Sequence, residues 1–219
     1  MVQKTFRLAE LLGVHKIVMM SGLPGAGPRD EYPNWIVSSW PAENMQILDY
    51  QWTVALEYWH KAVNRAQSYG IDCIALENHG CQLVYNCETM LRLRAEVGPL
   101  VGMNVDPSHL FWMGGDPQAV LRCLGPAVHH IHAKDARVEA VPCGQNTRLD
   151  AKSIDCLGQR SWNFAAVGSG HDLQWWKAFF AQARMIGYDG AVSLELEDVS
   201  MTAQQNLEKS TEILRQALV

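Results

Sequence analysis

The stretch that decides the fold is VGMNVDPSH at residues 101–109, where a largely apolar run of five residues ends on the acidic side chain of Asp106. Such a run is typical of a buried strand. The same order, a short apolar run followed by a polar residue, recurs at Glu77, His132 and Glu195. These four polar residues therefore lie at or near the carboxyl ends of four different predicted strands.

Apolar residues at helical spacing separate these strands, and Asp116 and Asp172 have the sequence context of helix N-caps. Alternating strands and helices build parallel βαβ units, in either a doubly wound sheet or a (β/α) barrel. In a barrel the carboxyl ends of the strands converge on one mouth, where catalytic groups collect, so the four polar residues favour a barrel. The strands are predicted at 14–20, 73–76, 101–105, 128–133, 164–167 and 191–196, and helices at 6–12, 43–69, 88–97, 117–124, 173–186 and from about 202.

Length and composition predict one domain spanning residues 1–219, because 48% of the residues are apolar and suffice for one core. The net charge of -5 and the absence of a basic run predict no nucleic-acid partner. No apolar stretch approaches the roughly 20 residues of a membrane helix, so we expect no membrane association and a cytoplasmic protein. Six cysteines without paired spacing are interpreted as reduced thiols, and the polar stretch 137–160 as a functional loop.

One imidazole and three carboxylates form a hard ligand set that suits Mn, Mg or Co better than structural zinc. The competing interpretation, that each acidic residue only caps the next helix, is weak for four residues that converge. His130 and His132 share one face of their strand, and only His132 ends it. Glu197 shares the face of Glu195 and is its rival as a ligand, with Glu195 preferred.

Seven motifs occur in order along the chain, and each is weakly specific alone. Together they resemble the sugar phosphate isomerase/epimerase family of the xylose-isomerase-like TIM-barrel superfamily, over nearly the whole length. The motifs are SGLPG at 21–25, YPNW at 32–35, ENHG at 77–80, NVDPSHLFW at 104–112, IHAKD at 131–135, VGSGHD at 167–172 and SLELED at 193–198.

This resemblance implies an α/β fold, an incomplete TIM-type barrel with about six of the eight βα units present and the first two absent. It implies one divalent metal ion bound by Glu77, Asp106, His132 and Glu195, with Mn favoured and Mg, Co or Zn open. Glu77 and Glu195 would be the catalytic pair that moves a proton between adjacent carbons of a sugar or polyol ketone through an enediolate. The residues that would contact the carbohydrate substrate are His79, His109, Trp112, Lys134, Asp135, Arg137 and His171.

A barrel that lacks two units has open edges, so we expect a homo-oligomer or a partner subunit to cover them. Two alternatives to an isomerase or epimerase stay open. A lyase or dehydratase could use the same enediolate to expel a β-leaving group, or the chain could be a non-catalytic metal-binding barrel fragment or subunit. An endonuclease for abasic DNA shares the fold but would need more metal-binding histidines and a basic groove, which the sequence lacks.

Overall fold

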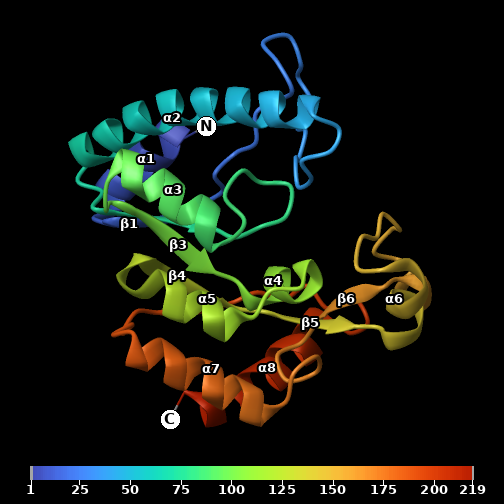
Figure 1. Ribbon diagram of the computed structural model, residues 1–219. Coiled ribbons are helices and arrows are strands. Elements are labelled where there is room, and N and C mark those ends of the chain that lie inside the picture. Colours follow the sequence, from blue (N-terminus) through green and yellow to red (C-terminus); the bar gives the residue numbers. More distant parts are fainter. Residues whose placement is uncertain (1, 219) are drawn as a thin grey trace. The chain divides into compact units, whose positions relative to one another are not determined.

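The computed structural model describes residues 2–218, so the first and last residues of the predicted domain lie outside it. Within this range, five strands pair side by side in one sheet, with parallel register wherever the register is defined (Figure 1). This arrangement is the parallel α/β fold of an incomplete TIM-type barrel, and the predicted fold class is confirmed. The strands in spatial order are β1 (Lys16–Met19), β2 (Cys73–Glu77), β3 (Val101–Val105), β4 (Val128–Ala133) and β7 (Val192–Leu194).

Most helices begin at a side chain that accepts a hydrogen bond from a backbone N–H of the first turn. Asp116 and Asp172 do this as predicted, and Asp106 caps a short helix that the sequence analysis treated as a turn. The described helices are α1 (Val2–Leu12), α2 (Glu43–Ser68), α3 (Cys87–Val97), α4 (Pro107–Met113), α5 (Pro117–Leu124), α6 (Ala140–Asn146), α7 (Leu173–Met185) and α8 (Ala203–Ala217), with 3-10 turns η1 (Gly125–Ala127) and η2 (Leu157–Gln159).

The prediction of a sixth barrel strand at 164–167 was wrong. This segment contributes to β6 (Trp162–Ala165), which pairs antiparallel with β5 (Asp135–Val138) in a separate two-stranded sheet. The stretch 137–160, expected to be a loop, contains the end of β5 together with α6 and η2. A short apolar run indicates a strand but does not identify its partner, because tertiary contacts choose the pairing.

The described chain divides into two compact units. The first unit holds residues 2–104 and 127–129, in which α2 and α3 are in contact and β2 pairs with its neighbours β1 and β3. Its largest fully buried side chains include Phe6 of α1, Trp52 and Trp59 of α2, Leu76 of β2 and Met90 of α3.

The second unit holds residues 105–126 and 130–218, and α7 in it packs against both α5 and α8 (Figure 1). Its core is built on Leu121, Trp176 and Phe179. No helix within 2–218 combines the length and the apolar composition that crossing a lipid bilayer requires. The expectation of a single domain stays a prediction.

Gly102 on β3 tests how closely the first unit is packed. A Cβ at this position would lie 2.4 Å from Cγ of His129 and 2.5 Å from the carbonyl oxygen of Ala127. We expect Gly102→Ala to lower the free energy of unfolding by about 1–3 kcal/mol, because a packed interior resists added volume. Urea denaturation followed by circular dichroism measures this. Gly144→Ala in α6, with no atom within 4 Å of its Cβ, is the control and should cost nothing; equal stability of the two variants would contradict the packing argument.

Candidate metal centre

Three predicted ligands converge in the second unit. Asp106 follows β3, His132 lies near the end of β4 and Glu195 directly follows β7, and their donor atoms lie within 4.8 Å of one another. Nδ1 of His132 is 3.1 Å from Oε1 of Glu195 and 3.8 Å from Oδ2 of Asp106. Oδ1 of Asp106 accepts hydrogen bonds from the backbone N–H and the hydroxyl of Ser108, which directs Oδ2 toward the imidazole. Two carboxylates and one imidazole thus lie close together, with Asp106 and His132 buried and Glu195 partly exposed.

The ammonium group of Lys134 is the internal counter-charge of this cluster. Lys134 is buried, and its Nζ lies 3.0 Å from Oε2 of Glu195, 2.6 Å from Oε2 of Glu197 and 3.9 Å from Oδ2 of Asp106. It also lies 4.2 Å above the ring of Phe164. Three carboxylates therefore approach one ammonium group: Asp106 is buried, Glu195 is partly exposed and Glu197 is exposed.

The charges around Asp106 determine its protonation. Burial by itself raises the pKa of this carboxyl, but the nearby charges of His109 and Lys134 and the hydrogen bonds from His132 and Ser108 outweigh burial and lower the pKa to about 2. Burial in turn lowers the pKa of Lys134, and the surrounding carboxylates outweigh it and raise that pKa above its ordinary value. Asp106 is thus an anion, and Lys134 a cation, near neutral pH.

Glu77 belongs to the first unit. It is the last residue of β2, it is buried, and its register partner on β3 is Asn104, two residues before Asp106. The backbone N–H of Asn78 donates to the carbonyl oxygen of Asn104, which continues the pairing one residue further. The role of Glu77 as a ligand and catalytic residue stays a prediction.

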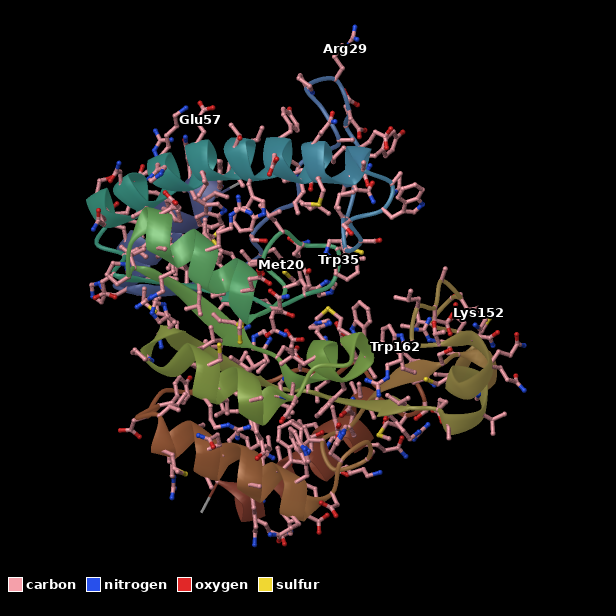
Figure 2. All side chains as sticks on the ribbon, in the orientation of Figure 1. Met20, Arg29, Trp35, Glu57, Lys152 and Trp162 are labelled. Atoms are coloured by element: carbon pink, nitrogen blue, oxygen red, sulfur yellow. The ribbon has the colours of Figure 1, made fainter. Side chains whose placement is uncertain are left out.

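His109 and Trp112, both predicted to contact substrate, lie on α4 in the second unit. Nε2 of His109 is 3.6 Å from Oδ2 of Asp106, and Nδ1 accepts a hydrogen bond from Nε1 of Trp112. The ring of Trp112 stacks on Trp162 of β6, with centroids 5.1 Å apart (Figure 2 labels Trp162). His109 is therefore held beside the ligand cluster by one aromatic donor and one carboxylate.

Asp135, the first residue of β5, contacts the loop before α7. Its buried carboxylate accepts hydrogen bonds from the backbone N–H groups of Gly168, Gly170 and His171, and its Oδ1 is 2.8 Å from Nδ1 of His171. The His171 ring stacks on Phe111 at 3.6 Å. Asp135 thus anchors the loop before α7, and its predicted contact with substrate is untested.

Arg137 and His79, two further residues predicted to contact substrate, make contacts with residues outside the cluster. Arg137 on β5 forms an ion pair with Glu139, with 2.8 Å between Nη2 and Oε1. His79 lies in the first unit, where its Nδ1 contacts the carbonyl oxygen of Gly80. Their substrate roles remain predictions.

The sequence alone did not identify the aromatic residues that surround His109 and His171. Phe164 meets the edge of the His109 ring, and Trp175 packs beside both Phe111 and His171. The eight tryptophans were the available signal, because such a number indicates an aromatic-walled pocket without locating it. Glu197 was considered only as a rival ligand, and the structure pairs it with Lys134.

The sequence of residues 1–217 matches the profile of the family described as xylose isomerase-like TIM barrel. The chain belongs to this family. The resemblance stated from the motifs is thereby confirmed. Uncharacterized protein YfiH of Bacillus subtilis (strain 168) is 52% identical to it over 218 residues, which cover 98% of this chain and 70% of that protein.

Solved structures share the fold at low sequence identity. A xylose isomerase domain protein from Planctomyces limnophilus matches with a TM-score of 0.61 and 18% identity over 99% of this chain, which spans 62% of the length of that relative. A structure of IOLI protein with a bound zinc atom matches with a TM-score of 0.65 and 17% identity, covering 99% of this chain and 67% of that one. These neighbours establish the fold alone.

The lowered pKa of Asp106 predicts how stability depends on pH in the metal-free protein. A carboxyl whose pKa is lowered on folding stabilises the native state above its unfolded pKa near 3.8, and this contribution is lost as pH falls toward 2. The difference in unfolding free energy between wild type and Asp106→Asn should therefore narrow by about 1 kcal/mol from pH 6 to pH 3. Urea denaturation at both pH values measures it. Asp116→Asn, which replaces one good N-cap with another, is the control; a pH-independent difference for Asp106→Asn would contradict the prediction.

The anchoring role of Asp135 predicts a large cost for Asp135→Asn. The amide NH₂ would face backbone donors that now bind a carboxylate oxygen, and we expect the free energy of unfolding to fall by about 2–4 kcal/mol. Thermal and urea denaturation measure the loss. Asp172→Asn, at the N-cap of α7, should change stability little because asparagine caps as well as aspartate. A small effect at Asp135 would mean that the loop before α7 is held by other contacts.

Proposed function

We propose that this chain is a divalent-metal-dependent isomerase or epimerase that moves a proton between adjacent carbons of a sugar or polyol ketone through an enediolate. The observation that carries the proposal is the convergence of the donor atoms of Asp106, His132 and Glu195. Carboxylate oxygens and imidazole nitrogens grouped in this way are typical ligands of divalent metal ions.

Glu77 would complete the ligand set. Its position beside Asn104, at the end of the strand adjacent to β3, supports its participation because the chain reaches Asp106 two residues later. Carboxylate-rich sites suit hard cations, so Mn is favoured, with Mg, Co or Zn as alternatives. Structural neighbours include IOLI protein with zinc and a xylose isomerase-like barrel from Mycobacterium smegmatis in complex with magnesium.

Different residues of this chain would carry out the separate steps of the proposed reaction. A bound divalent ion would polarise the carbonyl and hydroxyl oxygens of a ketone and stabilise the negative charge of an enediolate. Glu77 and Glu195 would remove and return the proton as general base and general acid. Lys134 holds Glu195 by a 3.0 Å contact, and His109 would donate a hydrogen bond to a substrate oxygen. Trp112 would form an aromatic wall against the sugar ring.

Two epimerases support a carbohydrate substrate. L-ribulose 3-epimerase matches with a TM-score of 0.65 and 13% identity, and D-allulose 3-epimerase from Methylomonas sp. in complex with D-allulose with a TM-score of 0.59 and 15% identity. A lyase or dehydratase is the second candidate, because the probable 3-DHS dehydratase AsbF from Bacillus anthracis matches with a TM-score of 0.65 and 17% identity. In a dehydratase reaction, Lys134 would protonate the leaving hydroxyl group.

We further propose that the protein is cytoplasmic, and that a second copy of the chain or a partner subunit covers the open sheet edge. Val18 is 40% exposed and Met20 39% exposed, both at or just after edge strand β1. Apolar side chains on an unpaired edge are a liability that association removes.

Metal binding and proton exchange test the proposed function together. Purified wild type should bind about one divalent ion per chain, and Asp106→Asn and His132→Ala should each weaken binding by roughly 100-fold or more, since each removes a ligand. In D₂O the metal-loaded protein should introduce deuterium into a ketose or inosose, and Glu195→Gln should slow this by about 100-fold or more. Elemental analysis and proton NMR are the measurements.

His60→Ala is the control for adventitious binding, because His60 is exposed on α2. Loss of water from the substrate with the same metal dependence would favour the lyase. Bound metal without exchange for any substrate would favour the non-catalytic fragment or subunit. Metal content that is the same in wild type, Asp106→Asn and His132→Ala would refute the site.

A further inference from the structure

The first unit contains a half-open cavity of about 130 Å³ between α2, α3 and the loops that follow β1 and β2. An engineered protein cavity of about 150 Å³ binds benzene, so this one has room for a group the size of one apolar amino-acid side chain. Among the residues that the structure describes, those lining the cavity include no proposed metal ligand and no predicted substrate contact. The cavity is therefore separate from the proposed metal centre.

Hydrogen bonds between the two loops hold the walls of the cavity in place. The backbone N–H of Gly22 donates to Oε1 of Gln82, and the N–H of Leu83 donates to the carbonyl oxygen of Gly22. The N–H of Val84 donates to the hydroxyl of Ser21. Small-molecule sites are usually preformed in this way, with walls that exist before the ligand binds.

The walls formed by α2 and the two loops are mainly apolar, and an occupant can reach them. Trp35 meets Tyr85 edge to face, with ring centroids 5.3 Å apart (Trp35, in the loop after β1, is labelled in Figure 2). Such walls favour an apolar occupant, because contact with them removes apolar surface from water. The apolar side chains of the lining that remain partly exposed are Leu23, Trp35, Ile36, Leu48 and Tyr85.

Helix α3 adds one acidic and one basic side chain to this lining. Glu88 and Arg92 are both exposed, and as residues four apart they lie on the same face of the helix. The guanidinium group of Arg92 lies 4.1 Å from the centre of the Trp52 ring. Burial, together with the charge of Glu88, raises the pKa of the Tyr85 hydroxyl, so the Glu88 carboxylate lies near that ring. Within residues 2–218 neither Glu88 nor Arg92 has an ion-pair partner.

This pair of charges selects the charge of the occupant. A ligand with only a negative charge is attracted by Arg92 and repelled by Glu88, and a ligand with only a positive charge meets the reverse. A ligand that carries both charges on neighbouring atoms satisfies both side chains. The Cβ atoms of such a pair are about 5–6 Å apart, and both side chains are long enough to reach adjacent groups of one small molecule. An arginine beside an aromatic ring keeps N–H donors for a carboxylate.

We propose that this cavity binds a free α-amino acid with an apolar side chain of about the size of leucine. The side chain would lie against Trp35, Leu48 and Tyr85, while Arg92 binds the carboxylate and Glu88 the ammonium group. An amino acid with a charged side chain is disfavoured, because its third charge would lie against apolar walls without a partner. This site goes beyond the proposed isomerase and needs neither metal nor turnover.

Calorimetric titration of the full chain with L-leucine tests the site. Two matched probes keep the leucine side chain: 4-methylpentanoate lacks the ammonium group, and 3-methylbutylamine lacks the carboxylate. L-leucine should bind one per chain. Each matched probe should bind about 5-fold more weakly or not at all, because it loses one charge contact at a solvent-exposed position. Equal affinity for the three compounds, or no binding of L-leucine, would overturn the proposal.

Two substitutions on α3 identify the charged contacts. Glu88→Gln should remove the preference for L-leucine over 4-methylpentanoate, and Arg92→Gln should remove the preference over 3-methylbutylamine. Glu96→Gln, at an exposed position of the same helix outside the lining, is the control and should keep both preferences. Preferences that persist in Glu88→Gln and Arg92→Gln would show that these side chains do not bind the ligand, and would refute the assignment.

Filling the cavity tests where the side chain of the ligand lies. Leu48→Trp should abolish binding of L-leucine, while circular dichroism shows that the variant is folded. Met45→Trp, on the same helix but outside the lining, should retain binding. Binding of L-leucine that persists in folded Leu48→Trp would place the ligand elsewhere and contradict the proposal. None of these outcomes depends on metal binding or proton exchange, so the proposed isomerase and this site can fail independently.

Discussion

The second unit depends on one electrostatic constraint, the need to balance the fully buried carboxylate of Asp106 and the buried ammonium group of Lys134. Asp106, Glu195 and Glu197 approach the ammonium group of Lys134, and an unpaired charge in such a place would cost several kcal/mol. The positive charge of Lys134 helps to lower the pKa of Asp106 and keeps this carboxyl ionised. The contacts that stabilise the folded unit therefore also keep an ionised carboxylate at the proposed metal site.

Lys134 and Asp135, which are adjacent in the chain after β4, have different structural roles. Lys134 contacts the carboxylates, whereas Asp135 accepts hydrogen bonds from backbone N–H groups of the loop before α7. His171 is fixed in this loop by Asp135 and by stacking on Phe111. The motif IHAKD therefore places a proposed ligand, a counter-charge and a loop anchor within four residues.

Much of the site could be predicted because it depends on local order along the chain. Apolar runs ending at Asp106, His132 and Glu195 placed these residues at strand ends, and parallel strands bring such ends to one edge. The pairing of β6 could not be predicted in this way. Its run of apolar residues resembles a barrel strand, and only the backbone hydrogen bonds to β5 show that it belongs to a hairpin. Glu197 likewise became a partner of Lys134 through a contact across 63 residues.

By itself the sequence determined the alternation of strands and helices, the helix caps at Asp116 and Asp172, and the types of ligand gathered at the strand ends. These follow from periodicity and from hydrogen bonds within a few residues. Only the tertiary structure decided that Asp135 is an anchor, that Glu195 meets both His132 and Lys134, and that Glu197 meets Lys134. Distances between residues far apart in the chain set these roles, and no local pattern encodes such distances.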